Sequence, residues 1–151
     1  STELSVFSGG KPLFSQSFNI GTIRMLDHRD KEETWQDMRE WIKTNCKKFK
    51  NLTGIGTGGN INKLFKLSEE KEGKPLSIIK LKKLYNYLNS FSLKERIQVL
   101  GLNPDRADVI IPASEIFLTV MQRAGIKQIY VPRLGMVDGI IQVLIQQNLK
   151  S

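Results

Sequence analysis

The sequence has few of the residues that build metal centres, disulfides and nucleophilic triads. Its 151 residues include a single cysteine, Cys46, and a single histidine, His28. One cysteine excludes an internal disulfide framework and is typical of a reducing compartment, so we expect a cytoplasmic protein. These two residues also fall short of a dedicated zinc site. One histidine gives little basis for a Ser-His-Asp or Cys-His catalytic arrangement.

Long apolar runs are missing as well. No run reaches the ~18 residues that a membrane-spanning helix needs, so we expect no membrane span. Residues 1–6 already have the pattern of a strand, which differs from that of a signal peptide. Hydrophobic residues nevertheless make up 40% of the chain, which at this length suffices for one domain with its own core.

Acidic residues are outnumbered by basic ones. The chain has 23 Lys and Arg against 15 Asp and Glu, which gives a net charge of +8 and a pI near 9.7. Such a surplus favours polyanionic partners such as nucleic acid, phosphates or an acidic membrane surface. A well-solvated surface without a partner would explain the charge equally well.

Alternating apolar residues predict a β-hairpin at the start of the chain, with strands over residues 4–7 and 13–18. The Ser-Gly-Gly sequence at 8–10 supplies the turn. A short helix is predicted from Gly21, and residues 30–49 have apolar side chains three and four apart, as in a long amphipathic helix.

The remainder of the chain alternates strands and helices. Short strands are predicted at 52–56 and 128–131, and helices at 60–67, 78–91, 92–100, 103–125 and 136–148. Ser92 and Glu95 form a capping-box pattern, and Asn103 with Pro104 starts the next helix. Pro112 lies inside that helix, where we expect it to produce a kink.

The strand-to-helix crossovers predict an α/β domain, with a mixed sheet and helices packed on its faces. In such sheets ligands bind at the carboxyl ends of strands. At one such position, four glycines fall within six residues: Gly54, Gly56, Gly58 and Gly59. Glycines let phosphate oxygens approach the free N–H groups at a helix start, so we expect a phosphate there.

Three alternatives bear on this glycine loop. Gly54, Gly56 and Gly59 match G-x-G-x-x-G, but residues 68–73 form a polar loop where a dinucleotide site needs a strand ending in Asp or Glu. A Walker loop is excluded because no Gly-Lys-Ser/Thr follows. A glycine turn that serves only close strand–helix packing stays open.

Other candidate residues are isolated in the sequence. Glu3 has no partner carboxylate in the hairpin, and Asp138 lies where a helix dipole alone would explain it. Arg24, Arg106 and His28 are predicted to be surface residues.

Several segments, in this order along nearly the whole chain, resemble one family. They are residues 1–5 (STELS), 17–24 (SFNIGTIR), 56–61 (GTGGNI), 103–108 (NPDRAD), 130–132 (YVP) and 135–141 (GMVDGII). Together they resemble the exopolyphosphatase and guanosine pentaphosphate phosphohydrolase family.

The resemblance implies a ribonuclease-H-like, actin-like ATPase fold, in which two lobes face each other across a cleft. Residues 1–151 would form the C-terminal lobe alone. The family's phosphate loop reads Asp-x-Gly-Gly-Gly-Ser-Thr-Glu, of which Ser1, Thr2 and Glu3 remain here. The opening strand of this lobe, and the first lobe with its catalytic glutamate, would precede Ser1.

The resemblance also implies a set of site residues. Those expected to contact phosphate are Ser1, Thr2, Thr57, Gly58, Gly59 and Asn60. Glu3 would hold Mg²⁺ or another divalent cation, which suits an ion that prefers carboxylates, water and substrate phosphates. Asp138 and Gly139 would lie at the far rim of the cleft.

The implied reaction is hydrolysis of a phosphoanhydride bond in polyphosphate or guanosine pentaphosphate, with metal-assisted attack of water. Without the first lobe the chain is expected to be inactive, and the parent protein could be a homodimer. A regulatory module that binds nucleotide or phosphate without hydrolysis is the alternative. A nucleic-acid-binding domain is disfavoured, because no recognisable motif is present and the aromatic residues have the pattern of a core.

Overall fold

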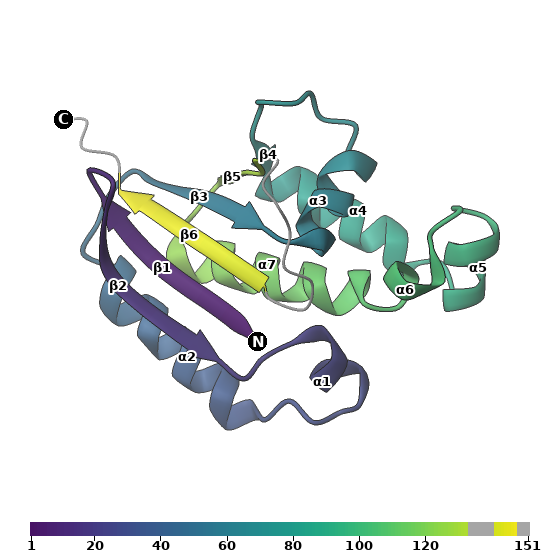
Figure 1. The fold of residues 1–151 in the computed structure, drawn as a ribbon, viewed down its shortest axis with the longest axis horizontal. Coiled ribbons are helices and arrows are strands. Elements are labelled where there is room, and N and C mark those ends of the chain that lie inside the picture. The colour runs from purple at the N-terminus through teal and green to yellow at the C-terminus, as the bar shows by residue number, and fades with distance from the viewer. Residues whose placement is uncertain (133–140, 148–151) are drawn as a thin grey trace.

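A six-stranded mixed sheet organises the chain (Figure 1). The computed structural model describes residues 1–132 and 141–147. The strands are β1 (Thr2–Ser8), β2 (Lys11–Phe18), β3 (Leu52–Thr57), β4 (Leu76–Ser77), β5 (Gln128–Tyr130) and β6 (Ile141–Gln147), in the spatial order β2-β1-β6-β3-β5-β4. The predicted hairpin of β1 and β2 and the predicted strands at β3 and β5 are confirmed.

The directions of the strands decide which ends meet. β6 runs parallel to β1 and antiparallel to β3, and β3 runs parallel to β5. The starts of β1 and β6 therefore lie beside the end of β3, at one end of the sheet. At the other end, β3 and β5 begin.

Helices pack on the sheet around one central helix. They are α1 (Thr22–Leu26), α2 (Glu32–Cys46), α3 (Gly59–Leu67), α4 (Ile78–Asn89), α5 (Leu93–Gln98), α6 (Pro104–Ala107) and α7 (Ile110–Ala124). The central helix is α7, which contacts α1, α2, α3, α4 and α6. In Figure 1, α2 and α7 lie behind β1 and β6. None of the helices among residues 1–132 combines the length and the apolar character that crossing a bilayer requires.

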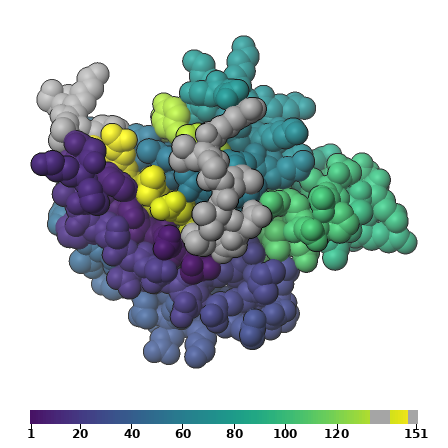
Figure 2. Space-filling model, in the orientation of Figure 1, coloured from purple at the N-terminus to yellow at the C-terminus, as the bar shows by residue number. Residues whose placement is uncertain are grey.

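The two faces of the sheet differ in burial. Leu4, Val6, Val143 and Ile145 alternate along β1 and β6 and are fully buried. Their sequence neighbours point to the opposite face, where β6 is visible at the surface in Figure 2 as a yellow band beside the purple hairpin. The period of two thus separates a core face under the helices from a second, partly exposed face.

Residues 141–147 were predicted as helix, and that prediction is wrong. They form β6, paired with β1 on one side and β3 on the other. Their apolar spacing satisfies both periods, because Ile141 and Leu144 suit a helix while Ile141, Val143 and Ile145 suit a strand. Two backbone ladders satisfy the polar groups of β6 on both sides, and this tertiary pairing decides the outcome. Residues 136–140 and 148 of the predicted helix lie outside the described residues.

The predicted kink at Pro112 is also wrong. The segment 103–125 divides into α6 and α7 at Asp108 and Val109, ahead of the proline. Pro112 then falls in the first turn of α7, where N–H groups have no intrahelical partner, so it disrupts no helical hydrogen bond.

Several predicted helix ends are confirmed. Ser92 and Glu95 form the complete capping box of α5. Asn103 caps α6 with Pro104 at its start, and Gly125, in a left-handed conformation (φ 71°), ends α7.

Cys46, at the end of α2, is buried, and burial raises the pKa of its thiol to about 11. The thiol is therefore protonated at neutral pH and has the character of a packing residue.

Two of the four loop glycines are explained by the core. A Cβ built on Gly56 would lie 2.8 Å from Ile129 Cδ1 and 3.2 Å from atoms of Ile61 and Phe117. A Cβ on Gly54 would meet Ile126 and Ile129 at 3.1 and 3.3 Å. At these two positions the interpretation of glycine as a packing requirement is correct.

We predict that Gly56→Ala destabilises the fold by about 1–3 kcal/mol, because the added methyl overpacks this part of the core. Ile129→Val removes the Cδ1 atom that the new Cβ would meet most closely. In urea unfolding, the double variant should therefore be more stable than the sum of the two single changes indicates. Strict additivity would contradict this account of Gly56.

Candidate functional site

The sheet brings the start of the chain close to the glycine loop. Glu3 is paired in register with Gln142, and Gln142 with Thr57. Neighbouring strands are ~4.8 Å apart, so the backbones of Glu3 and Thr57 lie about 10 Å apart across β6. All three side chains are half-exposed and belong to the same sheet face, and Thr57 Oγ1 donates to Gln142 Oε1 at 3.0 Å.

The two residues before Glu3 have different environments. Ser1 is exposed, and its carbonyl accepts a hydrogen bond from Ile141 N at 2.9 Å, which joins it to the start of β6. Thr2 is fully buried on the core face, and its hydroxyl donates to Ile20 O at 2.6 Å. The Thr2 hydroxyl therefore joins β1 to the segment before α1. The predicted contact of Thr2 with phosphate stays a prediction.

The loop from Thr57 to Asn60 is accessible. All four of its residues are half-exposed. Gly58 is the N-cap of α3, and its φ of 129° is a conformation that residues with a Cβ rarely adopt. Because Gly58 has no side chain, no side-chain cap covers the first N–H groups of α3. These donors and the positive end of the helix dipole together suit an anion.

Arg106 adds a positive charge to this loop. Its Nη1 atom donates to Asn60 Oδ1, and a Cβ built on Gly59 would lie only 2.7 Å from its Nη2. Arg106 was predicted as a surface residue, yet α6 holds it half-buried against the start of α3. The glycine at position 59 therefore makes room for a guanidinium, where we had expected it to admit a phosphate directly.

Two residues of this site were missed from the sequence. Arg106 lies 46 positions from Asn60, and nothing local marks the contact. Gln142 was assigned to a helix, and only the strand period of residues 141–147 could have placed it beside Thr57. Asp138 and Gly139, predicted at the far rim, lie outside the described residues and stay a prediction.

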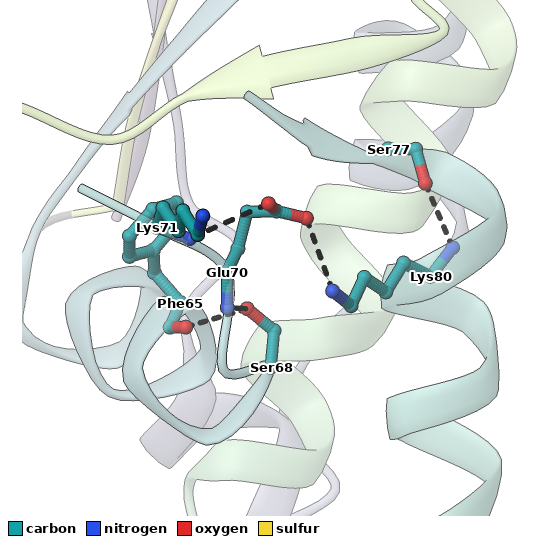
Figure 3. A network of polar contacts seen from close by, with 6 residues as sticks. All are labelled: Phe65, Ser68, Glu70, Lys71, Ser77 and Lys80. Atoms are coloured by element: carbon teal, nitrogen blue, oxygen red, sulfur yellow. Dashed lines mark hydrogen bonds and ion pairs between the residues drawn. The ribbon is translucent and has the colours of Figure 1, made fainter. Parts of the chain in front are cut away.

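The acidic segment after α3 has a structural role (Figure 3). Glu70 accepts a hydrogen bond from Lys80 Nζ of α4 at 3.0 Å, and this bond is the main cause of its lowered pKa. The Glu70 N–H donates to Ser68 Oγ, and Ser68 Oγ donates to Phe65 O. This network stabilises the loop that connects α3 to the edge strand β4. A dinucleotide site would instead need a strand here that ends in a carboxylate free to bind the ribose.

The described residues suit Mg²⁺ only as part of a larger ligand set. Glu3 is a half-exposed carboxylate on the face shared with Thr57 and Gln142. Residues 1–132 and 141–147 contain no group of three or more His, Cys, Asp or Glu arranged to hold a metal. Mg²⁺ commonly binds through one or two carboxylates together with water and substrate phosphates. Glu3 fits such a site as one of its ligands. The described residues do not form a closed set of protein ligands around the ion.

Comparison with protein-family models gives a match over residues 1–147, to the family described as the Ppx/GppA phosphatase family. The chain belongs to this family. The predicted family is thereby confirmed. A search of curated proteins returned no match.

Solved Ppx/GppA structures share the fold. The crystal structure of the family member from Aquifex aeolicus is 22% identical, with a TM-score of 0.63 over 88% of this chain and 53% of that one. An exopolyphosphatase from Cytophaga hutchinsonii is 18% identical, with a TM-score of 0.60 over 99% of this chain and 54% of that one. The chain therefore has the actin-like ATPase fold, as predicted, and spans about half the length of these relatives.

We predict losses of stability of different size at the two neighbouring loop glycines. Gly58→Ala should cost about 1–3 kcal/mol, because the backbone at this position is strained for any residue with a Cβ. Gly59→Ala should cost less than about 1 kcal/mol, because the atom it displaces is the mobile end of Arg106. Urea unfolding of both variants measures this difference. A greater loss at Gly59 would mean that the guanidinium cannot move aside.

Proposed function

We propose that residues 1–151 form the C-terminal lobe of a two-lobed hydrolase that releases phosphate from polyphosphate or guanosine pentaphosphate. Membership of the Ppx/GppA phosphatase family supports a phosphatase, and the coverage of about half of each solved relative supports a single lobe. One observation carries the proposal. An accessible helix start with an adjacent arginine lies at the same end of the sheet as Glu3.

In this proposal the loop binds the phosphate by its backbone. The N–H groups from Gly59 onward point out of the start of α3, and no side-chain cap at Gly58 competes with a phosphate oxygen for them. Thr57 and Asn60 add a hydroxyl and an amide at the same place. Arg106 supplies a charge whose planar fork matches two phosphate oxygens, and contact with phosphate would replace its bond to Asn60.

The start of β1 completes this half of the site. Ser1 is exposed and would contact a neighbouring phosphate, while Glu3 would hold Mg²⁺ or another divalent cation. Such a cation, when bound, offsets the negative charge that develops on the transferred phosphoryl group. The hydrogen bond from Thr57 to Gln142 fixes the Gln142 amide beside Glu3. β6 therefore sets the distance between Glu3 on β1 and the glycine loop after β3.

Activation of the attacking water belongs, in this proposal, to a glutamate of the other lobe. Residues 1–151 would then bind and orient the phosphates without turnover of their own. Placement of the parent in the cytoplasm, and its assembly as a homodimer, are further parts of the proposal. A regulatory module that binds phosphate without hydrolysis would share the same loop, so phosphate release is the measurement that separates the two functions.

We predict that the enzyme containing this chain releases phosphate from polyphosphate or guanosine pentaphosphate in a Mg²⁺-dependent manner. Glu3→Gln should lower the rate by at least about tenfold and raise the Mg²⁺ concentration needed for half-maximal rate, because a metal ligand loses its charge. Glu33→Gln, at an exposed position in the first turn of α2, is the matched control and should leave the rate unchanged.

Two outcomes would contradict this proposal in different ways. An unchanged rate for Glu3→Gln would remove Glu3 from the metal site while leaving hydrolysis intact. Tight binding of both substrates with no release of phosphate, in an enzyme with both lobes and Mg²⁺ present, would favour the regulatory module.

A further inference from the structure

A groove lined by basic residues lies far from the glycine loop, between α2 and the end of α7. It encloses about 700 Å³. Arg39, Lys43 and Lys47 line it from the α2 side and Arg123 lines it from α7, with Glu40 as its one acidic residue. Four positive charges and one negative charge give the lining a net charge of +3.

The helices explain why these charges converge. Arg39, Lys43 and Lys47 are four residues apart, so they share one face of the helix and its C-cap in a row about 12 Å long. α2 packs against α7, which brings Arg123, in the last turn of α7, to the other side of the groove. Gly125, with its left-handed backbone, then turns the chain away towards β5.

Most of this charge is not neutralised within the described residues. Arg39 pairs with Glu32 at 2.5 Å. Lys43, Lys47 and Arg123 are exposed and form no ion pair with any residue in the ranges 1–132 and 141–147. The dipole of each helix end favours one nearby cation. It does not account for four cations around a single concave surface, where the positive potential is concentrated.

We propose that this groove binds the chain of inorganic polyphosphate at a position remote from the reacting end. The cations of the row on α2 are about 6 Å apart along the helix, so they can contact phosphates spaced along one polyphosphate chain. No lining residue named here is specific for a base or a sugar. Proteins that bind single-stranded nucleic acid stack its bases on aromatic side chains. Phe49 is the only aromatic residue in the lining, it is half-buried, and Lys48 Nζ lies 5.4 Å from its ring centre.

The groove and the glycine loop are separate sites. The groove lies where β3 and β5 begin, because α2 and α7 lead into these strands, whereas the loop follows the end of β3. The six residues of β3 span about 20 Å, so a short phosphate compound cannot contact both. The choice of polyphosphate as ligand rests on the proposed function, while the preference for a polyanion rests on the groove itself.

The test measures binding of fluorescently labelled long-chain polyphosphate to the triple variant K43Q/K47Q/R123Q. We expect affinity to fall at least tenfold. We also expect the slope of log K against log salt to decrease by about 2, because each lost phosphate contact contributes ~0.7. Unlabelled pyrophosphate, which is too short to reach from the loop to the groove, should bind the variant and the wild type equally.

The matched control is K82Q/K83Q/K94Q, which removes the same charge from exposed positions on α4 and α5. It should bind long-chain polyphosphate within about twofold of the wild type. An equal loss in the control would show that total charge alone matters and would overturn the groove. Wild-type affinity in the groove variant would overturn it as well.

Two further measurements distinguish this proposal from RNA binding in the groove and from the proposed loop site. If single-stranded RNA of equal charge binds as tightly as polyphosphate, with the same dependence on the three groove residues, the assignment to polyphosphate is overturned. Gly58→Val should weaken pyrophosphate binding and leave the groove intact. If pyrophosphate binds neither protein while the groove variant loses long-chain affinity, the proposed loop site fails and the groove stands.

Discussion

The pairing of β6 with β1 and β3 is the interaction on which the rest of the structure depends. In the strand order, β6 is the only link between the hairpin and the half of the sheet that carries the glycine loop. Each of its residues has a register partner on β1, and six continue the register to β3, except at Ile141. Glu3 and Thr57 belong to one candidate site only because Gln142 lies between them.

The glycine loop shows how one sequence pattern can combine several physical causes. Positions 54 and 56 require glycine because apolar side chains of the core lie against the backbone there. Gly58 adopts a backbone conformation with positive φ that residues with a Cβ rarely adopt, and Gly59 leaves room for the guanidinium of Arg106. The spacing G-x-G-x-x-G is therefore no single device here. The candidate anion site lies at the last two of these glycines, where α3 starts.

The charge of the molecule is distributed in a similar way. Arg106 stands at the end of β3 and interacts with Asn60, while Arg39, Lys43, Lys47 and Arg123 surround a groove near its beginning. A surplus of basic residues in the composition says nothing about this separation. The packing of α2 against α7 creates the groove, since each helix alone would leave its cations dispersed in solvent.

The sequence by itself determined the features that depend on neighbours along the chain. The hairpin, the amphipathic α2, the capping box at Ser92 and the start of α6 at Asn103 were all predicted, because periodicity and capping are local. The order of short segments also identified the family. Tertiary structure alone decided three things: that Ile141–Gln147 is a strand, that Arg106 meets Gly59, and that the Thr2 hydroxyl is buried. Each depends on contacts between residues far apart in the chain. The segment 141–147 has apolar residues that satisfy both the helix and the strand period, and it forms a strand because its backbone pairs with β1 and β3.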